Sequence, residues 1–94
     1  MRQYELGEEI MRKINKRDDD IYELIAANIK ECRKQAKMTQ AELAEKSNYS
    51  HEFIRRIEAP NGKKYFSLDA LVKIARAMNV RVEILLKGIN NEEK

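Results

Sequence analysis

The side chains with the most evident binding chemistry lie in residues 51–57, where four polar residues are interspersed with two isoleucines and a phenylalanine. Ile54 and Ile57 are three residues apart, so in a helix they share one face and leave the polar side chains on the other. The outward positions are then His51, Glu52, Arg55 and Arg56. A guanidinium group donates hydrogen bonds in a planar fork that matches paired acceptors on carboxylates, phosphates and nucleic-acid bases. This segment is therefore a candidate recognition surface.

The rest of the sequence offers no comparable set of residues for catalysis or metal binding. One histidine and one cysteine exclude an internal disulfide and a zinc site with several cysteines. There is no glycine-rich phosphate loop, and no nucleophile is spaced with a base. We expect no enzymatic activity, no cofactor and no metal, and we interpret Cys32 as a core residue.

Composition sets the class of domain. The 94 residues suffice for one compact domain, and 37% charged with only 6% aromatic residues favours helices. The net charge of +3 is a mild positive bias, and the excess of basic over acidic residues begins at Lys63 and Lys64. Without a long apolar run, we expect no membrane span and a cytoplasmic protein.

Several helices are needed to position residues 51–58. Apolar residues recur every three or four positions from Ile21 to Ala36, which predicts one helix. Thr39 and Glu42 have the spacing of a capping box and predict a second, short helix over residues 40–46. Asn48 supplies a left-handed turn, and Ser50 caps a helix over residues 51–58.

A loop containing Pro60 follows, and Ser67 then caps a fourth helix. Its expected core face comprises Leu68, Leu71, Val72, Ala75 and Met78, and Asn79 is the expected left-handed stop. Residues 80–86 fit either a short helix or a strand, and we favour the helix. Residues 1–17 have a weaker amphipathic pattern, interpreted as an additional helix, and residues 89–94 form an expected disordered tail.

The combined pattern of Gln40 to Lys46, Asn48-Tyr49-Ser50 and Ile57-Glu58 resembles the helix-turn-helix of phage repressor and Cro proteins. The wider bacterial Xre-type family shares this pattern. The resemblance covers about residues 21–87 and does not extend to residues 1–20. It implies an all-α, five-helix repressor-like DNA-binding domain over residues 21–88, preceded by the N-terminal helical extension 1–20.

The resemblance also implies roles for individual residues. The helix over residues 51–58 would enter the major groove, as in phage repressors. Base contacts would come from His51, Glu52, Arg55 and Arg56, and phosphate contacts from Gln40, Ser50, Asn61, Lys63 and Lys64. Arg33 and Glu58 match a structural ion pair. Asn48 replaces a common glycine, and the loop after Glu58 is about two residues longer than usual. It therefore stays open which loop residue reaches the phosphates: Asn61, Lys63, Lys64 or Tyr65.

These observations predict a sequence-specific DNA-binding transcriptional regulator. We interpret it as a repressor of bacterial or phage origin, nucleoid-associated, binding a two-fold-related operator as a homodimer through its N-terminal helix or residues 80–89. One alternative is an antitoxin-like protein that binds a toxin partner and represses its own operon. Another is a family member that has lost DNA binding.

Overall fold

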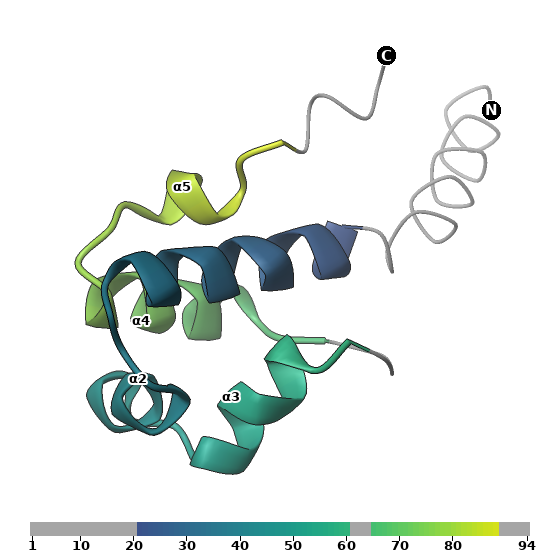
Figure 1. Cartoon of the computed structure of the whole chain (residues 1–94). Helices are drawn as coiled ribbons and strands as arrows, with labels where there is room; N and C mark the ends of the chain where they lie inside the picture. The colour runs from purple at the N-terminus through teal and green to yellow at the C-terminus, as the bar shows by residue number, and fades with distance from the viewer. Residues whose placement is uncertain (1–20, 61–64, 89–94) are drawn as a thin grey trace, which may run out of the picture.

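The computed structural model describes residues 21–60 and 65–88, and the secondary structure of these residues consists of helices joined by turns and loops (Figure 1). A first helix spans residues 21–35 and is followed by α2 (Gln40–Ser47), α3 (His51–Glu58), α4 (Leu68–Ala77) and α5 (Val82–Leu85). The prediction of an all-α fold is confirmed, and the ambiguous segment 80–86 contains a short helix. The expectations for residues 1–20, Asn61, Lys63, Lys64 and the tail 89–94 lie outside the described residues.

Three helices begin at the hydroxyl caps that the sequence predicted. Thr39 accepts a hydrogen bond of 3.0 Å from the Glu42 backbone N–H, and the Glu42 carboxylate accepts one of 2.8 Å from the Thr39 N–H. Ser50 and Ser67 each accept one bond of 3.0 Å from the backbone three residues on. These bonds satisfy amides that have no partner within the helix, so short-range sequence fixes where α2, α3 and α4 start.

Three helices also end in the same way, with a residue in the left-handed region. The φ angles are 58° at Lys37, 67° at Asn48 and 59° at Asn79. The next residue then donates to a carbonyl five positions back: Met38 to Arg33 at 3.1 Å, Tyr49 to Ala44 at 2.9 Å, and Val80 to Ala75 at 3.0 Å. Met38, Tyr49 and Val80 are also partly buried against the core. This combination is the Schellman motif with its apolar contact.

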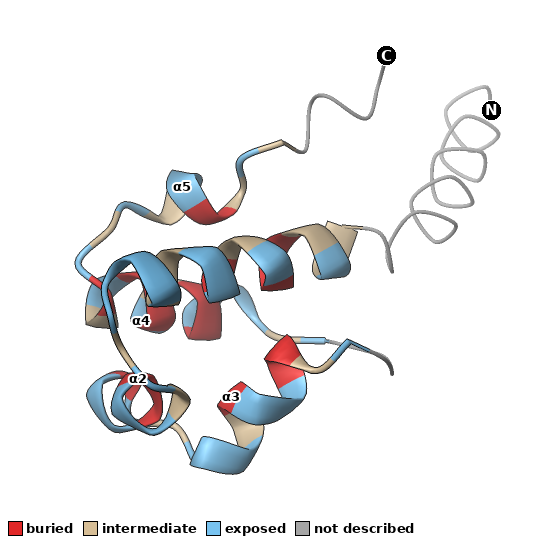
Figure 2. Ribbon diagram, in the orientation of Figure 1, coloured by how far each residue is buried: buried red, intermediate tan, exposed pale blue. Residues whose placement is uncertain are grey.

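The core receives one fully buried aliphatic side chain from every described helix (Figure 2). These residues are Ile29, Leu43, Ile54, Ile74 and Leu85, each with no exposed surface. Burying an aliphatic side chain of this size stabilises a fold by about 1.5–3 kcal/mol. Since each helix contributes one, none of them can leave without opening the common core.

The expected core face of α4 was wrong at two residues. Leu68 is 71% exposed and Val72 is only partly buried, whereas Ala70 and Ile74 are buried beside Leu71 and Ala75. Helical spacing centres the buried stripe on these four positions and leaves Leu68 at its edge, in the first turn of the helix. The stripe of the first helix is likewise shorter than expected, because the helix ends at residue 35 and Ala36 is exposed.

Two sets of contacts attach later segments to the first helix. The Tyr22 ring meets Phe66 edge-on at 4.9 Å and Tyr65 at 5.2 Å between centroids, which holds the segment entering α4. Asn28 donates hydrogen bonds of 2.9 Å to the carbonyls of Leu85 and Lys87, which holds the end of α5. In the described part of the chain, no helix is long and apolar enough to cross a membrane.

Candidate nucleic-acid interface

The α2–turn–α3 unit presents α3 at the edge of the molecule, on the opposite side of the first helix from α5 (Figure 1). Asn48, Tyr49 and Ser50 form the turn, and the left-handed Asn48 redirects the chain after α2. Ile54 and Ile57 face the core, being at most 4% exposed. The buried and exposed faces of α3 are therefore sharply separated.

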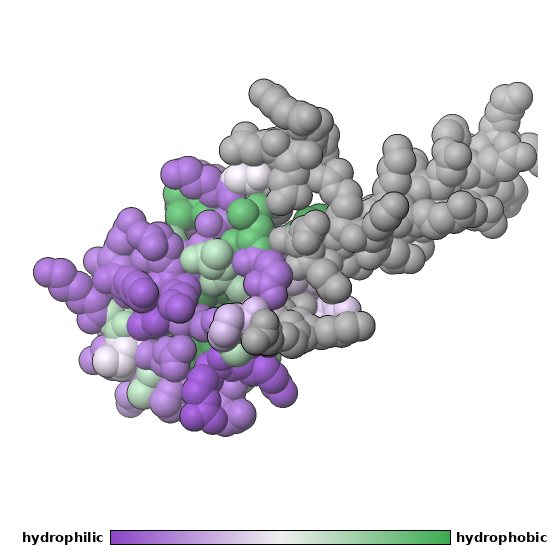
Figure 3. Space-filling view, turned by 45° about the vertical axis from the view of Figure 1, so that its right-hand side comes forward, coloured by the Kyte–Doolittle hydropathy of each residue, from purple (hydrophilic) through white to green (hydrophobic). Residues whose placement is uncertain are grey.

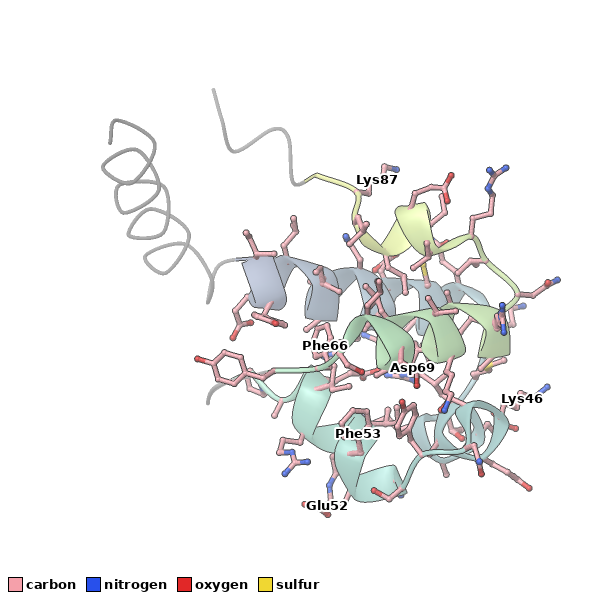
Figure 4. The ribbon with its side chains drawn as sticks, turned by 180° about the vertical axis from the view of Figure 1, so that it is seen from behind. Lys46, Glu52, Phe53, Phe66, Asp69 and Lys87 are labelled. Carbon is pink, nitrogen blue, oxygen red and sulfur yellow. The ribbon has the colours of Figure 1, made fainter. Side chains whose placement is uncertain are left out.

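All four polar side chains predicted to face outward on α3 are exposed: His51, Glu52, Arg55 and Arg56. Figure 4 shows Glu52 at the end of α3 that lies farthest from α4. Arg55 donates a hydrogen bond to the Glu52 carboxylate, one helical turn away. Arg56 has no ion-pair or hydrogen-bond partner among the described residues. The two arginines thus differ, since Arg55 is held by Glu52 and Arg56 is held by no described residue.

The opposite end of α3 is held by a buried carboxylate. Arg33 Nε lies 2.8 Å from Glu58 Oε2, and Arg33 Nη2 donates to Glu58 Oε1 at 2.9 Å. The two side chains are 11% and 1% exposed. Arg33 also donates to the Met38 carbonyl at 2.7 Å, so one guanidinium connects the end of the first helix to α3. A bidentate pair of this kind fixes orientation as well as charge.

Gln40 joins the same network, which sequence reasoning missed. Its side-chain amide donates to Glu58 Oε1 at 3.0 Å, and the residue is half-buried at the start of α2. A carboxamide has two N–H donors, so the second remains for another acceptor. Ser50 is exposed, and its hydroxyl oxygen accepts from Phe53. Its own O–H is a donor for which no partner appears in the described part of the chain.

An aromatic column supports the turn between α2 and α3. The rings of Tyr49 and Phe53 stack with centroids 4.6 Å apart, and Lys73 Nζ lies 5.7 Å from the Tyr49 centroid. Lys73 in turn pairs with Asp69 at 3.2 Å. Tyr49 lies in the turn before α3, so helical spacing in the sequence did not signal this stack.

The remaining chemistry of the described residues lies in their polar surface and in one thiol, Cys32. Hydrophilic side chains predominate over the described part of the face in Figure 3, and the most hydrophobic colour lies in its upper half. Among the described residues, no three His, Cys, Asp or Glu side chains gather as metal ligands. Burial raises the pKa of Cys32, nearby Glu31 raises it further, and Lys87 lowers it. A thiol with a raised pKa stays protonated at neutral pH and is a poor nucleophile.

Two short helices joined by a left-handed turn, the second exposed along one face and held by a buried ion pair, define a helix-turn-helix domain. The helix-turn-helix family model matches residues 29–85, and the chain belongs to this family. This match confirms the family resemblance found in the sequence.

Among curated proteins, the chain is similar to an uncharacterized HTH-type transcriptional regulator, YqaE, from Bacillus subtilis (strain 168). The two are 31% identical over 70 residues, which cover 74% of this chain and 59% of that protein. The match therefore spans less than two thirds of the relative's length. No solved structure matches the chain.

Proposed function

We propose that this chain is a sequence-specific double-stranded DNA-binding transcriptional regulator that inserts α3 into the major groove. The family match supports this role, as does the description of the Bacillus relative. The observation that carries it is the division of α3 into a buried face, with Ile54 and Ile57, and an exposed face with two arginines. An α-helix with its side chains is about 10–12 Å across, and the major groove is about 12 Å wide.

The exposed face of α3 has the donors and acceptors that base edges require. Arginine forms paired hydrogen bonds with O6 and N7 of guanine, and a carboxylate accepts from the amino group of cytosine. His51, Glu52, Arg55 and Arg56 are the proposed base-facing side chains. Since Arg56 has no partner among the described residues, it is free to reach a base without first breaking an ion pair.

Phosphate contacts would come from the helix starts that flank the groove. Gln40 begins α2 with one amide hydrogen that bonds to no described residue, and Ser50 caps α3 and is exposed. Backbone N–H groups at these ends favour an anion. Asn61, Lys63 and Lys64 follow α3 in the sequence, and we propose them as further phosphate contacts because cations neutralise the DNA backbone.

A helix of eight residues reads only a few base pairs, so a long operator requires two copies. We propose a homodimer on a two-fold-related operator with half-sites about 34 Å apart, acting as a repressor in the cytoplasm. Ile84 of α5 is a large apolar side chain that is 41% exposed, and it makes residues 80–89 a candidate dimer surface. The molecular mass of an Ile84→Glu variant in solution tests this surface, since we expect the dimer to dissociate into monomers.

The direct test of DNA recognition is Arg56→Ala on operators selected from random DNA. We expect an affinity loss of about 1–3 kcal/mol, concentrated at one base pair, because a bidentate base contact disappears. Fluorescence anisotropy across single-base operator variants measures the loss.

Arg76→Ala is the matched control, because Arg76 is an exposed arginine in the last turn of α4. It removes the same charge outside α3 and outside residues 80–89, and we expect affinity close to wild type. A small, uniform loss in Arg56→Ala across all operators would make Arg56 a backbone contact. A wild-type protein that binds no duplex at low salt would refute the proposed function.

A further inference from the structure

We infer that Glu52 is a positioning residue that orients Arg55 toward a guanine and so determines specificity at one base pair. This inference rests on the proposed function. It assigns Glu52 a role through Arg55, whereas Arg55 itself touches the base.

The geometry of α3 supports this assignment. Glu52 and Arg55 are separated by one helical turn on the exposed face, with side chains 68% and 59% exposed. Arg55 uses Nη2 to donate to Glu52 Oε1. A guanidinium has five N–H donors, so this bond leaves the others available for the O6 and N7 acceptors of guanine. The ion pair thus restricts the orientation of the Arg55 side chain and leaves its other N–H donors available for a base.

The contrast with Arg56 shows what the ion pair adds. A long side chain loses rotamer freedom when it binds, and a side chain already held in one orientation loses less. Arg55 is held by a neighbour, while Arg56 is not held by any described residue. The two arginines should therefore recognise DNA differently, with Arg55 more dependent on a single well-placed base.

The charge of Glu52 gives the inference a distinctive signature. A carboxylate near the groove is repelled by phosphates and by the guanine acceptors, so Glu52 weakens binding to DNA that offers Arg55 no guanine. Removing the charge should raise affinity for random DNA and lower discrimination at one base pair. A purely structural role at the start of α3 would change stability and would not produce this combination.

The chain provides a matched control in α4. Asp69 is also a first-turn carboxylate, 71% exposed, and it holds Lys73 one turn further on at 3.2 Å. Glu52→Gln and Asp69→Asn each remove one negative charge, one intrahelical ion pair and one favourable interaction with a helix N-terminus. Only Glu52→Gln changes the surroundings of Arg55.

The experiment uses the full chain and a selected operator in which single guanines are replaced by 7-deazaguanine, which lacks the N7 acceptor. The guanine read by Arg55 is the one whose replacement no longer matters in Arg55→Ala. At that guanine we expect wild type and Asp69→Asn to lose affinity about 10-fold or more on replacement. Glu52→Gln should lose less than about 3-fold, and its affinity for a random duplex should rise by more than that of Asp69→Asn.

Each outcome decides between the alternatives. Unchanged discrimination in Glu52→Gln, or an Arg55 that reads no guanine, would overturn this inference and leave the proposed function standing. A wild-type chain that binds no duplex would overturn the proposed function and the inference together. Thermal unfolding of the two charge variants checks that both are folded, and equal melting temperatures are expected.

Discussion

At the scale of single residues, the most consequential side chain is the carboxylate of Glu58. It is 1% exposed and accepts hydrogen bonds from Arg33 of the first helix and Gln40 of α2. Removing a charge from water is expensive, and this network compensates because both carboxylate oxygens are hydrogen-bonded. One buried group therefore sets the position of α3 relative to two other helices.

The first prediction concerns Arg33, the main hydrogen-bond partner of Glu58. Arg33→Met should lower the free energy of unfolding by about 3–5 kcal/mol, because Glu58 stays buried without its counter-charge. Urea denaturation followed by circular dichroism measures the change.

A double variant separates the value of the ion pair from the penalty of breaking it. Arg33→Met with Glu58→Leu removes both charges, and we expect it to recover much of the stability lost in the single variant. A loss below about 1 kcal/mol in Arg33→Met would show that the pair is effectively solvated, as surface pairs are.

The sequence was informative about which residues of α3 face inward and less so about their partners. The positions of Ile54 and Ile57 followed from helical periodicity, and the Arg33–Glu58 match came from the family resemblance. The Gln40–Glu58 bond and the Tyr22 contacts join residues 18 or more positions apart, and no local pattern reports such distances.

At the scale of helices, the ends were predictable where residue chemistry is specialised. Ser and Thr caps have hydroxyl oxygens in reach of free amides, and Asn48 and Asn79 tolerate a left-handed backbone. Lys37 adopts the same conformation, but lysine has no such tendency, so its role was invisible in the sequence. The core contact of Met38 after it compensates for an unfavourable backbone at Lys37.

The second prediction follows from the unfavourable φ angle of Lys37. Lys37→Gly should raise the free energy of unfolding by about 0.5–1 kcal/mol, since the steric penalty of the left-handed region exceeds the added entropy of the unfolded chain. Thermal and urea unfolding measure the gain. Lys37→Ala should change little, and Lys34→Gly, within the helix, should lower stability by about 1 kcal/mol. An equal decrease in the free energy of unfolding in Lys37→Gly and Lys34→Gly would contradict this explanation.

The last helix was ambiguous for a physical reason. Its spacing of apolar residues fits two periodicities, and Arg81 provides no side-chain cap. A single turn has little intrinsic stability, so tertiary contacts decide its conformation. Leu85, with no exposed surface, and the Asn28 amide are those contacts.

At the scale of the whole molecule, Asn28 connects the two ends of the described chain. It binds two carbonyls at the end of α5, 57 and 59 residues away in the sequence. The third prediction is that Asn28→Ala lowers the free energy of unfolding by about 1–3 kcal/mol, the sum of two hydrogen bonds. Hydrogen exchange should show the amides of α5 losing protection first.

Gln35→Ala is the control for this prediction. Gln35 also uses its amide as a donor, but its partner Glu31 lies on the same exposed helix face at 3.2 Å. Its removal should leave α5 protected and stability within about 0.5 kcal/mol of wild type. Uniform loss of protection throughout the chain in Asn28→Ala would show that α5 does not open separately.

In α3, the side chains that secure the helix and those that meet solvent are different residues. Ile54, Ile57 and Glu58 attach it to the protein, and the polar positions on the other face take no part in that attachment. The outward residues can thus be exchanged as a set at little cost to folding. Under the proposed function, the scaffold is therefore suited to retargeting, in which new combinations at those positions would select new operators while the rest of the chain stays unaltered.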